Sequence, residues 1–83
     1  MKDDLRLAKL ALKQLRERGE KEIFIDKCDI DDRDTEILKR RILKKQSNHE
    51  VALAMNMSPE SAQEHYRDAM ITLYMIIQKY RHE

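Results

Sequence analysis

The sequence predicts an all-α protein, a single small domain of about four helices. Apolar residues recur at helical spacing along most of the 83 residues, and 40% of the residues are charged. Glycine and proline, which interrupt helices, occur once each. We expect residues 1–29 to form an amphipathic helix with a connector. Residues 30–83 should form the main helical body of the same compact unit.

The first helix is expected from Asp3 or Asp4 to Arg18, with Gly19 as its C-terminal cap. Its apolar stripe consists of Leu5, Ala8, Leu12 and Leu15, widened by Leu7, Leu10 and Ala11. This stripe either covers the domain's own core or takes part in a seam with a second copy or another protein. The seam candidates are Leu5, Leu12, Leu15, Tyr74 and Ile77.

The segment Glu20–Cys28 is predicted to be a connector whose apolar triplet, residues 23–25, pins it onto the core. A short extended segment is the alternative, although a lone strand does not make a sheet. The single cysteine, Cys28, excludes an internal disulfide framework and suits a reducing cytosol. We expect it to be a small packing residue.

The second helix should begin near Asp31, because several aspartates crowd the start of this segment and favour the positive end of a helix. Calcium binding is a poorer explanation, since the spacing lacks the glycine and the terminal glutamate of a calcium loop. Ile37, Leu38, Ile42 and Leu43 are expected to face inward. The last two turns carry the cations Lys39, Arg40, Arg41, Lys44 and Lys45. These form either a solvated face that complements the helix dipole or a surface for phosphates.

Two further helix starts follow, and both have local signatures. Ser47 with Glu50 three residues later is a capping box, and Ser58 followed by Pro59 is an N-cap with proline at the first helical position. Asn56 is the expected turn residue between them, because asparagine tolerates the left-handed conformation. Helix, short turn and helix in this order predict a helix-turn-helix.

The last helix is expected from Ser58 to about Tyr80, which is long for a domain of this size. Its inward stripe comprises Ala62, Tyr66, Ala69, Met70, Leu73, Ile76, Ile77 and Tyr80. The part beyond Ala69 should pack on the N-terminal leucine helix or pair with a second copy.

The order of these motifs is similar to that of a known family. Residues 33–47 have its pattern of an arginine, aliphatic residues, a basic pair and a serine. Residues 50–52 match its Glu-Ile-Ala, and residues 55–58 lie where it has Leu-Gly-aliphatic-Ser. Residues 59–62 resemble its Xaa-Glu-Thr-Val. The segment Ile30–Leu73 thereby resembles region 4 of sigma-70-type RNA polymerase sigma factors and, more loosely, LuxR-type output domains.

This resemblance implies a cytoplasmic DNA-binding transcriptional regulator whose last helix enters the major groove of promoter or operator DNA. Its body could also contact RNA polymerase, and a second copy of the chain is a further expected partner. Free-standing proteins of this kind resemble small regulators of bacteriophages and mobile elements. The candidates for base edges are Ser61, Gln63, Glu64 and Arg67. The candidates for backbone phosphates are Arg41, Lys44, Lys45, Ser47 and Asn48.

The sequence departs from the family at the front of the last helix. The family usually has lysine or arginine at the positions of Gln63 and Glu64. Here Glu60, Glu64 and Asp68 surround a single cation, Arg67, and carboxylates repel phosphates. The alternative is therefore a protein-interaction module that binds RNA polymerase, a sigma factor or another regulator through a sigma-like body.

Catalytic, metal-binding and membrane-spanning patterns are absent from the sequence. His49, His65 and His82 are scattered without metal-ligand spacing, and His65 is expected to be an isolated histidine on a helix surface. No apolar run approaches the roughly 20 residues of a membrane span, and the acidic N-terminus does not resemble a secretory signal. We expect no enzyme activity, no metal and no cofactor.

Overall fold

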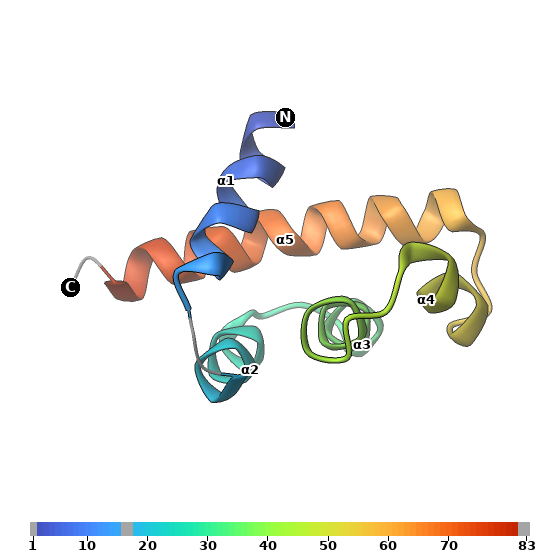
Figure 1. The fold of residues 1–83 in the computed structure, drawn as a ribbon, viewed down its shortest axis with the longest axis horizontal. Helices are drawn as coiled ribbons and strands as arrows, with labels where there is room; N and C mark the ends of the chain where they lie inside the picture. The colour runs from blue at the N-terminus through green and yellow to red at the C-terminus, as the bar shows by residue number, and fades with distance from the viewer. Residues whose placement is uncertain (1, 16–17, 82–83) are drawn as a thin grey trace.

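The computed structural model describes residues 2–15 and 18–81. Its central element is the long helix α5 (Pro59–Arg81). This 23-residue helix is about 34 Å long and contacts each of the other α-helices. Figure 1 shows α1 (Lys2–Lys13) crossing α5 on one side, with α2 and α3 on the opposite side. The short helix α4 lies beside the first turns of α5.

The remaining elements are α2 (Arg18–Lys27), α3 (Asp32–Leu38), the π-helical turn η1 (Lys39–Leu43) and α4 (Asn48–Ala54). The described residues contain helices and turns but no strand, so the all-α prediction is confirmed. The α-helices number five in that part of the chain, rather than about four, because the expected connector is itself helical.

The boundary of the first helix was predicted incorrectly. Helix α1 ends at Lys13 instead of Arg18, and Gly19 lies in the first turn of α2 instead of capping α1. The amides of Gln14 and Leu15 donate to carbonyls three residues earlier, at 3.2 and 3.0 Å, which tightens and closes the last turn. This closure directs Leu15 into the core, where it is only 2% exposed. Residues 16 and 17 lie outside the described part of the chain.

The connector prediction is wrong as to conformation but correct as to packing. Ile25 of α2 and Cys28 just after the helix are buried, and Phe24 packs against the core. Ile23 on the other side of the helix is 56% exposed. Three consecutive apolar residues do not by themselves distinguish a helix from a strand, and here only part of the triplet faces inward. The ring of Phe24 meets Tyr80 edge to face, with 6.4 Å between the centroids.

The core follows one stripe of α5. Its buried members are Ala62, Tyr66, Ala69, Met70, Leu73 and Ile77. Ile76 is only partly buried and Tyr80 is 42% exposed, so the predicted stripe is narrower than expected at its C-terminal end. Ile37 and Leu38 from α3 and Val51 from α4 complete the core opposite α5, and all three are fully buried.

Leucine-to-alanine substitutions at two positions of equal chemistry test this packing. Leu73 is fully buried, whereas Leu53 is 85% exposed. We expect Leu73→Ala to lower the free energy of unfolding by about 2–5 kcal/mol, since it removes buried methyl groups and leaves a cavity. Leu53→Ala should stay within about 0.5 kcal/mol of the unsubstituted protein. Urea unfolding followed by far-ultraviolet circular dichroism measures both, and equal losses would contradict the described core.

Candidate functional site

The beginning of α4 is fixed by the predicted capping box. The Ser47 hydroxyl accepts a hydrogen bond from the Glu50 amide at 3.2 Å, and the Glu50 carboxylate accepts one from the Ser47 amide at 3.0 Å. Two amides that the helix leaves without intrahelical partners are thereby satisfied. The chain therefore enters α4 at one defined residue, as the sequence predicted.

The turn after α4 is closed by Asn56, whose φ of 57° lies in the left-handed region. Asn56 donates its amide to the Leu53 carbonyl at 3.3 Å, and Met57 donates to the Ala52 carbonyl at 2.8 Å. This pair of bonds is the Schellman arrangement, in which the residue after the helix reverses the chain direction. The turn prediction for Asn56 is confirmed, and α4 and α5 are two separate helices.

The beginning of α5 is capped and also attached to α4. The Ser58 hydroxyl accepts from the Ser61 amide at 3.1 Å, and Pro59 takes the first helical position. The side-chain amide of Asn48 donates to the Pro59 carbonyl at 2.9 Å, which joins the starts of the two helices. Asn48 was expected to contact phosphate, and the structure engages its amide group within the protein instead.

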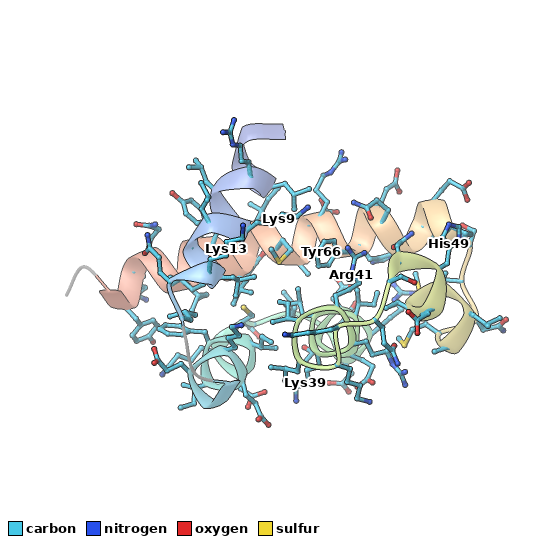
Figure 2. The ribbon with its side chains drawn as sticks, in the orientation of Figure 1. Lys9, Lys13, Lys39, Arg41, His49 and Tyr66 are labelled. Carbon is cyan, nitrogen blue, oxygen red and sulfur yellow. The ribbon has the colours of Figure 1, made fainter. Side chains whose placement is uncertain are left out.

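Arg41 lies behind this pair of helices and holds it against the body. Its guanidinium carbon is 4.0 Å from the centroid of the Tyr66 ring, and one of its nitrogens donates to the Asn48 side-chain oxygen at 3.4 Å. Figure 2 shows Arg41 and Tyr66 side by side, below the middle of α5 in this view. Burial raises the pKa of Tyr66, and the charge of Arg41 acts against that shift. Arg41, another phosphate candidate, therefore has a packing role in this structure.

The basic segment before α4 is not a regular α-helix to its end. At the end of η1, the backbone amide of Lys44 donates to the Lys39 carbonyl at 3.1 Å. After Lys45, the backbone amide of Gln46 donates to the Arg40 carbonyl at 2.9 Å. Lys45 takes a left-handed φ of 56°, although it is neither glycine nor asparagine. No pattern in the sequence indicates this widened turn, which redirects the chain into Ser47.

The cations of this segment divide into two groups. Lys39 pairs with Asp26 of α2 at 3.3 Å, and Arg40 pairs with Glu36 one turn earlier at 2.8 Å. Lys44 and Lys45 are exposed, and among the described residues their side chains form neither ion pairs nor hydrogen bonds. Of the basic phosphate candidates, these two remain available to a partner.

The front of α5 is open to solvent. Glu60, Glu64 and Arg67 are exposed, and Ser61 and Gln63 are partly exposed. Ala62 on the opposite side of the same turns is fully buried against the body. The structure therefore brings the base-edge candidates together on one accessible face, with Arg67 nearest α1.

His65 is not the isolated surface histidine that the sequence suggested. Its Nδ1 lies 2.9 Å from a carboxylate oxygen of Asp34, so the pair joins α5 to the first turn of α3. The two residues are 31 positions apart in the chain, and sequence spacing gives no sign of the contact. The amide of Asp34 also donates to Asp31, which is the N-cap of α3 near the predicted start.

Most of the seam candidates are buried in the core of the single chain. Leu12, Leu15 and Ile77 are 9%, 2% and 1% exposed. The others, Leu5 and Tyr74, are partly buried against the same core. The leucines of α1 that face solvent are Leu7 and Leu10, at 43% and 47% exposure.

The described residues show no group of three or more histidine, cysteine or acidic side chains placed to hold a metal. Over the same residues, no helix combines the length and the apolar character that crossing a membrane requires. No family model matches the chain, and no curated protein or solved structure shows significant similarity to it. Function therefore has to be inferred from the chemistry and the exposure of the surface side chains.

Cys28 provides a test of the packing of α2. Its thiol donates to the Phe24 carbonyl at 3.5 Å, and burial raises its pKa from 9.0 to about 11. The protonated thiol therefore stabilises the fold below pH 9, and that contribution is lost as the pH rises through about 11. At pH 8 we expect a disulfide reagent to label Cys28 about 100-fold more slowly in the folded protein than in urea. Equal rates in the two states would contradict the described position of Cys28.

Proposed function

We propose that this protein is a DNA-binding transcriptional regulator that uses α4, the Asn56 turn and α5 as a helix-turn-helix. The observation that supports this proposal is the fixed α4–α5 pair, which leaves the first turns of α5 exposed. The residues from Glu60 to Arg67 span about 10 Å along the helix axis. A major groove about 12 Å wide admits a helix of this kind.

The exposed side chains of α5 have the chemistry to distinguish base pairs. A glutamine such as Gln63 pairs with adenine, a glutamate such as Glu64 accepts from the amino group of cytosine, and Arg67 suits guanine. Ser61 is able to bond to either partner of a base pair. The acidic face lowers the attraction to phosphates, so recognition by this helix depends on base contacts more than on general affinity.

Lys44 and Lys45 supply the phosphate contacts in this proposal. They are exposed, and they have no ion-pair partner among the described residues. Only Gln46 separates them from the capping box of α4. Ser47 is exposed beside them. These contacts position the protein on the duplex without specifying a sequence.

A second candidate function is a protein-interaction module for RNA polymerase, a sigma factor or another regulator. The observation that favours it is the exposed row of carboxylates on α5, formed by Glu60, Glu64 and Asp68. Leu53, 85% exposed on α4, adds an apolar side chain to the surface of the same helix pair. A surface that binds a basic protein instead of DNA would have this composition.

Random-oligonucleotide selection with the purified protein, run at two salt concentrations, separates the two functions. The DNA-binding proposal predicts an enriched motif at both concentrations, with affinity falling as salt rises. A motif with two-fold symmetry would also indicate a dimer on DNA. Absence of enrichment, together with co-purification of RNA polymerase, would favour the interaction module.

Arg67→Ala tests the base contact on the selected duplex. If Arg67 bonds to a guanine, we expect the substitution to weaken specific binding by about 1–3 kcal/mol and to relax the preference at one position. The matched control is Lys79→Ala, which removes one positive charge about 18 Å further along α5. Fluorescence anisotropy measures both affinities, and equal effects of the two substitutions would count against base contact by Arg67.

Replacing Lys44 and Lys45 together by alanine tests the phosphate contacts. We expect lower affinity for every duplex and a log–log salt slope that is smaller in magnitude by about 2 units, because two counterion-releasing contacts are lost. The sequence preference found by selection should not change, since phosphate contacts carry no direct sequence information. An unchanged salt slope would show that these two lysines do not contact DNA phosphates.

A further inference from the structure

A groove lies between α1 and α5, and Arg67 is the residue of α5 that lines it. Its volume is about 380 Å³, near the lower end of the range of ligand-binding pockets in proteins. Figure 2 shows two of its residues, Lys9 and Lys13, on α1 where this helix crosses α5. The lining residues are Leu5, Arg6, Lys9, Leu10, Lys13 and Arg67.

Four of the six lining residues are cations, and none of the six is acidic. Among the described residues, these four cations form neither an ion pair nor a hydrogen bond, in contrast to Lys39 and Arg40, which pair with carboxylates. Cations that converge in a groove whose lining contains no acid raise the local positive potential. The groove therefore attracts a negatively charged partner.

The remaining lining residues are apolar. Leu5 is partly buried against the core, and Leu10 leaves 47% of its surface exposed at the groove. The neighbouring Leu7 of α1 is 43% exposed. Exposed leucines bordered by cations favour an occupant that brings an apolar side chain as well as negative charge, because burial of apolar surface and charge complementarity then act together.

We propose that this groove binds a short acidic segment of a partner protein. One apolar side chain of the segment packs on Leu5 and Leu10, and carboxylates on either side of it pair with the cations of the lining. A protein segment fits better than a DNA duplex, because the groove accommodates side chains but not a double helix.

This inference concerns a different surface from the DNA-binding proposal, and Arg67 is the residue that the two share. The test therefore changes Lys9 and Lys13 of α1 and leaves Arg67 in place. The variant is Lys9→Glu/Lys13→Glu, and its matched control is Lys44→Glu/Lys45→Glu, which makes the same change in charge on another surface. Circular dichroism and urea unfolding establish that both variants retain the fold. The neutral pair Lys9→Ala/Lys13→Ala replaces the first variant if reversal unfolds it.

The experiment is selection of peptides that bind the full chain from a displayed library of random 12-residue sequences. We expect enriched peptides in which aspartate or glutamate flanks a leucine, isoleucine or phenylalanine. Their affinity should fall about 10-fold or more in the Lys9/Lys13 variant, because charge-assisted hydrogen bonds are lost, and should change little in the Lys44/Lys45 control. The same peptides with glutamine in place of each acid should lose affinity to a similar extent.

Three outcomes would overturn the inference. The first is the absence of any enriched peptide, and the second is enrichment of neutral or basic sequences. The third is an equal effect of the variant and the control, which would indicate general attraction to charge. If no peptide is enriched but the Lys9→Ala/Lys13→Ala pair weakens DNA binding and reduces the salt slope, the groove holds phosphates instead. The peptide-selection results do not depend on whether α5 contacts bases, so the two proposals fail separately.

Discussion

The burial of one continuous face of α5 determines where the other α-helices lie. The small residues Ala62 and Ala69 allow neighbouring helices to approach closely, and Met70, Leu73 and Ile77 fill the space between them. Because all the other α-helices pack on α5, their positions follow from that stripe. The first turns of α5 are covered by α3 and α4 on one side only, and the opposite side is left to solvent. An exposed face at this end is thus a consequence of how the core is built.

The placement of α4 adds a second layer of constraint, because a seven-residue helix is not stable alone. Its first residue bonds to the first residue of α5, and Arg41 connects Asn48 to the ring of Tyr66. A surface held in this way loses little conformational freedom when a partner binds, which favours affinity. The side chains that hold the surface are partly the ones that the sequence suggested for phosphate contact. We propose that Lys44 and Lys45 provide the positive charge for phosphates. Arg41 and Asn48 hold α4 in its position beside α5.

The sequence predicted the features that depend on local rules. The capping box at Ser47, the left-handed Asn56 and the N-cap of α5 each need only a few neighbouring residues, and all three are confirmed. The helical state of α2 was missed because a triplet of apolar residues lacks a period. The π turn, the His65–Asp34 contact and the groove beside α1 depend on segments brought together by folding, or on backbone geometry without a sequence signature. The exposed face of α5 mixes carboxylates with few cations, and this composition fits both a base-reading helix and a surface for a basic protein.

We propose that the first turns of α5, held beside α4, contact the partner molecule. Backbone amide chemical shifts of the labelled protein, followed by nuclear magnetic resonance during titration with the selected duplex, locate this contact. We expect the shifts to change mainly at residues 44–48 and 58–68, and amides near the C-terminal end of α5 to change little. Changes confined to α2 or to the end of α5, or no change at saturating duplex, would contradict it.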